Sequence, residues 1–389
     1  MFRFLTSGES HGKVLTATLE GLPAGLELSS AQIDRELARR QLGYGRGKRM
    51  QIESDTAQIL SGVRHGRTLG SPITLQIENR DWVNWKESMA AETPAAGAKL
   101  REVTRPRPGH ADLPGALKFG TYDARNVLER ASARETAARV AVGAVCKVFL
   151  AKFGTEILSH VVSVGSHTHP PGTEIPWKTI QAIPDDSPLR CTDRELERRM
   201  MQLIDEVHDV GDTIGGSFEV VARKTPTGLG SYTQWDLRLD ALLARALVSI
   251  PSVKGVEIGD AVSGSTRKGS EYQDEIFYHK ARQSFFRRTN RAGGIEGGVS
   301  NGEEIRVRAF VKPLSTLRRP KQSVDLKTKK PFAAAVERSD TNALLAAGVI
   351  GETVVAIVLA ERALAKFGGD SLEETLRNFR GYQRQLKAY

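Results

Sequence analysis

The sequence contains little of what indicates a disulfide-stabilised, membrane-spanning or base-stacking protein. Only two of its 389 residues are cysteines, Cys146 and Cys191, which excludes a disulfide scaffold and a four-cysteine zinc site. Aromatic residues make up 6% of the chain, which argues against an aromatic platform for single-stranded nucleic acid. No uninterrupted run of about 18 apolar residues occurs, and the residues from Met1 to Phe4 do not begin a signal peptide. The sequence therefore predicts a cytoplasmic protein without a membrane segment.

Positive charge is abundant by contrast. The chain has 56 Lys and Arg against 46 Asp and Glu, a formal net charge of +10, and its basic residues gather in residues 35–49, 101–107, 282–291 and 318–330. Arginine dominates three of these four clusters, and its planar guanidinium suits carboxylates and phosphates. The clusters lie in glycine-rich loops without interleaved aromatics, and no helix-turn-helix, zinc-finger or RNA-recognition signature is present. A solvated surface, nucleic acid and small anionic ligands all remain open at this point.

Apolar periodicity predicts interleaved strands and helices. Strands are expected over residues 14–20, 72–77, 155–164, 215–224 and 306–312, and helices over 31–42, 122–153, 192–208, 236–249, 341–367 and 371–386. Residues 170–188 and 317–331 are expected to be loops, and a capping box is expected to start at Thr192. The spacing does not follow strict βαβ units, which favours an α+β fold with antiparallel or mixed sheets. No linker divides residues 1–389, so one domain is expected.

Two short motifs present histidines from constrained loops. His11 lies between Gly8 and Gly12 immediately before a strand, in a segment that lacks the spacing of a P-loop. His110 follows two prolines and Gly109 in the segment Arg105-Pro-Arg-Pro-Gly-His-Ala-Asp112, which stiffens the loop and places His110 beside Asp112. A catalytic histidine and an ordinary turn with a surface histidine both remain open for each motif.

Other motifs indicate anion binding or no chemistry. Lys312 to Thr316 provides a cation and two hydroxyls at a strand end, which are reasonable phosphate contacts, and Ala292 to Gly302 holds five glycines that permit close approach of a ring or phosphate. His167 and His169 have no third ligand nearby, so no metal site is predicted. Cys146 lies in an apolar helical segment and is expected in the core.

Taken together, these segments resemble the chorismate synthase family along nearly the whole chain. The resemblance rests on Gly8 to Gly12, Arg105 to Asp112, Arg130 to Arg139, Val253 to Gly259, Gly293 to Gly302, Lys312 to Thr316 and Arg338 to Asp340. It implies a β-α-β sandwich with an internal pseudo-twofold duplication. It also implies an anti 1,4-elimination of phosphate from 5-enolpyruvylshikimate 3-phosphate, which yields chorismate with the help of reduced FMN and without net redox change.

The resemblance also assigns roles to residues. The catalytic candidates are His11, as an acid toward the leaving phosphate, His110, near the flavin N1 edge, and Asp340, near flavin N5. The candidate FMN contacts are Arg130, Ala131, Ser132, Pro251, Ser252, Gly297, Lys312, Pro313, Leu314, Ser315, Thr316 and Arg338. The candidate substrate contacts are Arg40, Arg46, Arg49, Arg107 and Arg134, because the substrate carries two carboxylates and a phosphate.

Partners and alternatives follow from the same comparison. The resemblance implies a homotetramer, and the absence of an extra domain-sized insertion favours an external flavin reductant, with NADPH acting only indirectly. Ser252 departs from the alanine that is frequent at this position, and its hydroxyl is expected to be tolerated. A basic nucleic-acid-binding protein and a flavin reductase are the competing hypotheses, distinguished by salt dependence and by direct NADPH oxidation.

Overall fold

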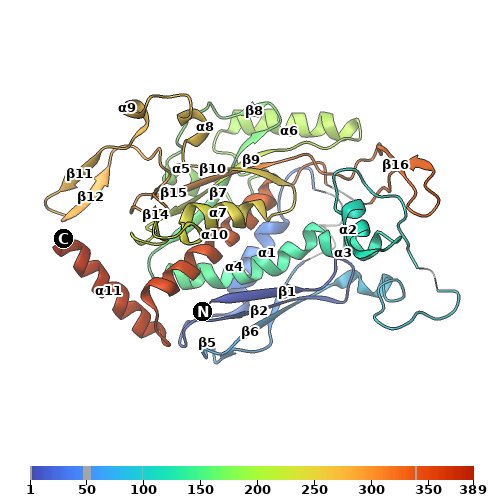
Figure 1. The fold of residues 1–389 in the computed structure, drawn as a ribbon, viewed down its shortest axis with the longest axis horizontal. Helices are drawn as coiled ribbons and strands as arrows, with labels where there is room; N and C mark the ends of the chain where they lie inside the picture. Colours follow the sequence, from blue (N-terminus) through green and yellow to red (C-terminus); the bar gives the residue numbers. More distant parts are fainter. Residues whose placement is uncertain (1, 47–53, 99, 338–339) are drawn as a thin grey trace.

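Two antiparallel sheets enclose a layer of helices in the computed structural model (Figure 1). The structure describes residues 2–46, 54–98, 100–337 and 340–389. The first sheet has the order β1-β2-β6-β3, formed by Arg3–Ser7, Val14–Glu20, Ile73–Glu78 and Ala57–Ile59. The second has the order β10-β15-β9-β7-β8, formed by Val253–Ile258, Ile305–Val311, Gly216–Arg223, Glu156–Val164 and His167–Thr168. The first sheet thus comes from residues 3–78 and the second from residues 156–311, in agreement with an α+β sandwich.

The helices between the sheets are α1 (Ser30–Gln41), α4 (Thr136–Ala151) and α10 (Leu344–Phe367). The alternation of β2 explains the packing, because Leu15, Ala17 and Leu19 are buried toward the helices while the threonines between them face outward. Helices α4 and α10 approach closely at Gly143, where an added Cβ would lie 2.3 Å from the Cβ of Thr353. Small residues in both helices therefore permit this central contact.

One hydrophobic cluster runs through the whole sandwich, from Phe2 to Phe379. Helix α7 (Leu239–Val248) and the last helix, α11 (Leu372–Ala388), pack at its periphery. Helix α10 is long and apolar enough to cross a membrane, with a mean hydropathy of 2.0 in its most apolar window. However, 94% of that window is buried inside the protein, which is typical of the core helix of a soluble protein.

Several predicted boundaries are wrong, and each has a local cause. The single helix expected over 122–153 is broken at Ser132, which adopts an extended conformation (ψ 144°) between α3 (Arg125–Ala131) and the short 3₁₀ turn η3 (Ala133–Glu135) that precedes α4. The N-cap of α6 (Arg194–Asp209) is Asp193 rather than Thr192, because its carboxylate accepts hydrogen bonds from the N–H groups of Glu195 and Leu196.

Two expected loops also contain regular structure. The loop expected over 170–188 contains α5 (Trp177–Gln181). The loop expected over 317–331 contains β16 (Gln322–Val324), which pairs with β17 (Pro331–Ala333). The sequence analysis did not predict α2 (Asp112–Phe119), nor the hairpin formed by β11 (Ile276–His279) and β12 (Ser284–Arg287).

Candidate active site

His11 is held in the loop between β1 and β2 by contacts to the end of α3. Its Nδ1 lies 2.9 and 3.0 Å from the two carboxylate oxygens of Glu129, and its backbone N–H donates to the same carboxylate at 2.8 Å. The indole ring of Trp85 stacks on the imidazole with a centroid distance of 3.7 Å. The residue is only 6% exposed. One face and one nitrogen of the imidazole are therefore already occupied by protein groups.

His110 has a similar support in the loop that precedes α2. Its Nδ1 lies 2.5 Å from Oδ1 of Asp112, the first residue of α2, whose side chain is fully buried. Arg107 donates to the same carboxylate from Nε at 2.8 Å, from Nη2 at 3.1 Å and from its backbone N–H at 3.0 Å. Burial raises the pKa of Asp112, but the hydrogen bonds from His110 and Arg107 outweigh it and keep the pKa well below its usual value.

The segment from Lys312 to Thr316 lies against this histidine loop. The carbonyl of Gly109 accepts hydrogen bonds from Nζ of Lys312 and from Oγ of Ser315, both at 2.8 Å. Thr316 accepts from Nη1 of Arg107 at 2.8 Å, and the backbone N–H of Lys312 donates to the carbonyl of Ser252. Three segments that are distant in sequence, 105–112, 251–252 and 312–316, are thereby joined at one place.

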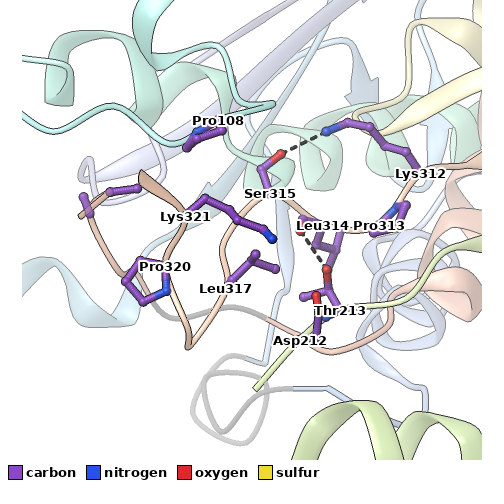
Figure 2. A pocket seen from close by; sticks show the side chains of 12 residues that line it. Pro108, Asp212, Thr213, Lys312, Pro313, Leu314, Ser315, Leu317, Pro320 and Lys321 are labelled. Carbon is purple, nitrogen blue, oxygen red and sulfur yellow. Dashed lines mark hydrogen bonds between the residues drawn. The ribbon is translucent and has the colours of Figure 1, made fainter. Parts of the chain in front are cut away.

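A cavity of about 190 Å³ opens beside these residues, and Figure 2 shows its lining. Ser315 and Lys312 are hydrogen-bonded on one side, and Thr213 donates to the carbonyl of Leu314 on another. The side chain of Lys321 extends across the view toward Leu314. Ligand pockets commonly measure about 300–1,000 Å³. The cavity is therefore large enough for part of a flavin nucleotide but not for the whole molecule.

Residues 335–337, which precede Asp340 in the chain, contact the segment before His110 and helix α3. The backbone N–H of Ala335 donates to the carbonyl of Arg105, and Glu337 accepts a hydrogen bond from Nη2 of Arg125 at 3.1 Å. Asp340 then forms an ion pair with Arg46 at 3.3 Å. Residues 335–337 thus contact both the segment before His110 and the arginine that holds Glu129, the partner of His11. Arg338 and Arg49 lie outside the described residues.

The predicted contacts at the end of α3 lie next to the His11 loop. Ser132 donates from Oγ to Oγ of Ser10 at 3.2 Å, and Arg130 donates to the carbonyls of Thr6 and Gly8. Ala131 lies between them as the last residue of the helix.

Two predicted substrate-binding arginines share a buried carboxylate nearby. Arg134 donates to Oδ1 of Asp55 at 2.6 Å, and Nη1 of Arg40 lies 3.6 Å from Oδ2 of the same side chain. Arg40 also donates to the carbonyl of Ala133, the residue after Ser132. The arginines therefore lie beside the predicted flavin contacts at the end of α3.

Gly297 is not joined to this cluster. It forms the turn between β13 (Ile295–Glu296) and β14 (Val299–Ser300), and the carbonyl of Gly298 accepts a hydrogen bond from the N–H of Leu239 at the start of α7. Pro251 and Ser252 follow the opposite end of that ten-residue helix, about 15 Å away at 1.5 Å per residue. Figure 1 also places the β14 hairpin far from α2 and α3.

Three residues that support His11 were not predicted from the sequence: Trp85, Arg125 and Glu129. Trp85 lies in an irregular region after the 3₁₀ turn η2 (Arg80–Asn84), where no local pattern indicates that it stacks on His11. Glu129 immediately precedes the motif from Arg130 to Ser132. A carboxylate next to that motif was the signal that the sequence contained.

The remaining predicted features lie elsewhere. Cys146 is fully buried in α4, as expected, and burial raises the pKa of its thiol. His169 directly follows the edge strand β8 of the second sheet, where its Nε2 lies 3.2 Å from Oγ1 of Thr192 and 3.7 Å from Sγ of Cys191. In the part of the chain that the structure describes, no group of three or more His, Cys, Asp or Glu is arranged to hold a metal ion.

Comparisons with known proteins match chorismate synthases along nearly the whole chain. The sequence profile of the family described as chorismate synthase matches residues 2–364. The chain is 56% identical to the chorismate synthase of Solibacter usitatus and 53% identical to that of Geobacter sulfurreducens, with full coverage of each pair. A crystal structure of a chorismate synthase superposes with a TM-score of 0.81 at 42% identity, covering 100% of this chain and 99% of the other.

Proposed function

The chain belongs to the chorismate synthase family, and from this premise we propose which residues perform the reaction of that family. The activity is that of a carbon–oxygen lyase in the shikimate pathway, which eliminates phosphate from 5-enolpyruvylshikimate 3-phosphate to give chorismate for aromatic amino-acid biosynthesis. The observation that supports the assignment of residues is that Ala335 binds the segment before His110, while Glu337 binds Arg125, which also holds the Glu129 partner of His11.

Family membership implies a flavin cofactor, and we propose that it is reduced FMN. The donor groups at the cavity fit its phosphate, because Lys312 and Ser315 offer an ammonium and a hydroxyl beside Gly109, and Thr316 follows them with a hydroxyl that binds Arg107. Burial, together with the charge of Lys254, lowers the pKa of Lys312, and a bound phosphate would favour its charged form. When bound, the reduced flavin would supply a transient electron and accept the unactivated hydrogen at C6 of the substrate.

The other proposed FMN contacts come from several segments of the chain. They are Arg130, Ala131 and Ser132 at the end of α3, Pro251 and Ser252 after α7, Pro313 and Leu314 in the cavity wall, and Arg338 and Gly297. Gly297 has the weakest support because of its distance from the others. Ser132 and Ser252 present hydroxyls that can orient a polar ring edge.

His11 is proposed to protonate the leaving phosphate. Its Nδ1 is bound to Glu129, so Nε2 is the nitrogen that remains to donate a proton to a phosphate oxygen. His110 is proposed to exchange a proton with the flavin through Nε2, since its Nδ1 is bound to Asp112. Asp340 is proposed to accept a proton, and its pairing with Arg46 keeps a cation close to it.

The substrate is proposed to bind beside Asp340 and the end of α3. Its two carboxylates and phosphate require several cations, and Arg40, Arg46, Arg49, Arg107 and Arg134 are the candidates. Arg40 and Arg134 are held by Asp55, which fixes the direction of both guanidinium groups. Fixed guanidinium groups bind an anion with less loss of side-chain entropy than mobile ones.

The decisive experiment is anaerobic turnover with dithionite-reduced FMN and 5-enolpyruvylshikimate 3-phosphate. We expect chorismate and phosphate in equal amounts, and His11→Ala and His110→Ala should each retain FMN binding while turnover falls about 10²-fold or more. A folded His11→Ala variant with the rate of the unmodified enzyme would remove His11 from the mechanism.

We also propose a cytoplasmic homotetramer that takes its reduced flavin from an external reductant. Light scattering during size-exclusion chromatography measures the assembly. An NADPH oxidation assay with free FMN tests the reductant, and rapid oxidation by the purified chain would contradict the proposal and favour an intrinsic flavin reductase.

A further inference from the structure

Both proposed catalytic histidines direct the same nitrogen at a buried carboxylate. His11 places Nδ1 within 3.0 Å of both carboxylate oxygens of Glu129, and His110 places Nδ1 2.5 Å from Asp112. The side chains of Glu129 and Asp112 are 2% and 0% exposed, whereas that of His110 is 20% exposed. The two histidines come from different loops, so the repeated arrangement is not a consequence of one local motif.

Each carboxylate is fixed in turn by an arginine. Arg125 donates to Glu129 at 2.9 Å from the preceding turn of α3, and Arg107 donates to Asp112 through several N–H groups. Arg125 also binds Glu337, four chain positions beyond β17 in the segment that leads to Asp340. Burial raises the pKa of Glu129, but the hydrogen bonds and charges of His11 and Arg125 outweigh it and lower the pKa. Both carboxylates are therefore ionised near neutral pH.

An ionised carboxylate can only accept hydrogen bonds, so the imidazole nitrogen that faces it must carry a proton. Nη2 of Arg107 also lies 3.1 Å from Nδ1 of His110, but an unprotonated Nδ1 would leave two hydrogen-bond acceptors 2.5 Å apart at Asp112. The short contact to Asp112 therefore decides the position of the proton on His110.

We propose that Glu129 and Asp112 are positioning residues that hold His11 and His110 with the proton on Nδ1, which leaves Nε2 as the working nitrogen of each ring. This inference rests on the proposed function of the two histidines. A carboxylate behind a catalytic imidazole fixes both its tautomer and its orientation, and it stabilises the imidazolium when the ring is protonated. Trp85 adds a second restraint on His11 alone, because its ring covers one imidazole face.

The first test uses the unmodified holoenzyme. In a sample with ¹⁵N-labelled histidine, both ring nitrogens of His11 and His110 are assigned by comparison with His11→Ala and His110→Ala. We expect the neutral form of each ring to carry its proton on Nδ1, with Nε2 unprotonated. A neutral ring protonated on Nε2 would overturn the proposal, whatever the activity of the enzyme.

The second test removes the negative charge with little change of volume. Glu129→Gln and Asp112→Asn should each lower kcat about 10²-fold or more, while KM and the dissociation constant of FMN change by less than about threefold. The histidine tautomer should become mixed in the same variants. Glu129→Asp keeps the charge, so it should retain the Nδ1-protonated ring and recover part of kcat even if Glu129→Gln folds poorly.

A matched control is available in the second sheet. Glu219 is also buried between a histidine and an arginine, with His160 at 3.2 Å and Arg306 at 3.0 Å, but the side chain of His160 is 1% exposed and none of the three residues lines the cavity. Glu219→Gln should leave kcat of the folded enzyme unchanged. Equal losses of kcat in Glu219→Gln and Glu129→Gln would indicate a purely structural effect and overturn the proposal.

The same set of variants separates this proposal from the proposed function. Loss of activity in His11→Ala with an unchanged kcat in Glu129→Gln would contradict the positioning role alone. Full activity in His11→Ala would instead contradict the role of His11 in the reaction.

Discussion

A buried charge cluster between the helices predicts a large and pH-dependent effect of Glu352 on stability. Glu352 lies in the middle of α10 with no exposed surface. Its carboxylate accepts hydrogen bonds from Arg39 at 2.7 and 2.8 Å and from Lys147 at 2.7 Å, and it also binds the backbone N–H and the hydroxyl of Ser159. It therefore connects α1, α4 and α10 with strand β7.

The magnitude of the effect follows from what Glu352→Ala leaves behind. Removing one partner of a buried ion pair costs about 3–5 kcal/mol, because the remaining charge is left without compensation. Glu36 would still bind Arg39 at 2.7 Å and Lys147 at 2.9 Å, and both cations are 17% exposed on their side chains. We therefore expect a loss near the lower limit, about 3 kcal/mol.

The pH dependence has a definite sign. Burial raises the pKa of Glu352, but the charges of Arg39 and Lys147 outweigh it, so the pKa in the folded protein lies below its ordinary value of 4.5. Glu36 is shifted in the same direction. A lowered pKa contributes stability above the unfolded value, and this contribution is lost as the pH falls. The difference between the unmodified protein and Glu352→Ala should therefore decrease as the pH falls below about 4.5.

The assay is urea unfolding followed by circular dichroism at pH 7 and pH 4, at one fixed protein concentration because association changes the apparent stability. Glu361→Ala is the matched control, since Glu361 lies on the same helix, is 37% exposed on its side chain and pairs only with its neighbour Arg362 in the described structure. Its loss should stay below about 1 kcal/mol. A Glu352→Ala variant no less stable than this control would refute the reasoning.

Two further predictions concern the helix layer. Gly143→Ala should destabilise the protein by about 1–3 kcal/mol or more in the same urea assay, because the new Cβ meets Thr353 at 2.3 Å. Gly269→Ala is its control, since nothing lies within 4 Å there, and an equal loss in both variants would show that packing is not the cause. Cys146 should not react with a thiol reagent in the native protein at pH 8, because burial both blocks access and raises its pKa. Rapid labelling of Cys146 before unfolding would contradict its place in the core.

An element was predicted well where its apolar and polar residues alternate in the same way as its buried and exposed positions. Strand β2 was predicted with its observed limits, because buried and outward residues alternate along it. The break at Ser132 was missed because the apolar pattern continues on both sides of it. The signal was present but local, since the hydroxyl of Ser132 accepts a hydrogen bond from the N–H of Arg134 and caps the next turn.

The site was predictable only where its partners are close in sequence. His110 and Asp112 are two positions apart, so a sequence motif contains both the imidazole and its carboxylate. His11 and Glu129 belong to a loop of the first sheet and to α3, and no local pattern relates them. Such a contact depends on how α3 packs against the first sheet. The apolar periodicity of the two segments contains no information about that packing.

The buried ion pairs also change what the net charge of +10 means. Nucleic acid binds through phosphate contacts to exposed cations. Arg107 and Arg134 are 7% and 6% exposed and are held by Asp112 and Asp55, so these two cations do not face solvent. Guanidinium groups fixed in this way present a few directed donors inside a site, which suits a small ligand with several anionic groups better than a long polyanion. No ligand is proposed for the exposed basic residues of the segment 318–330.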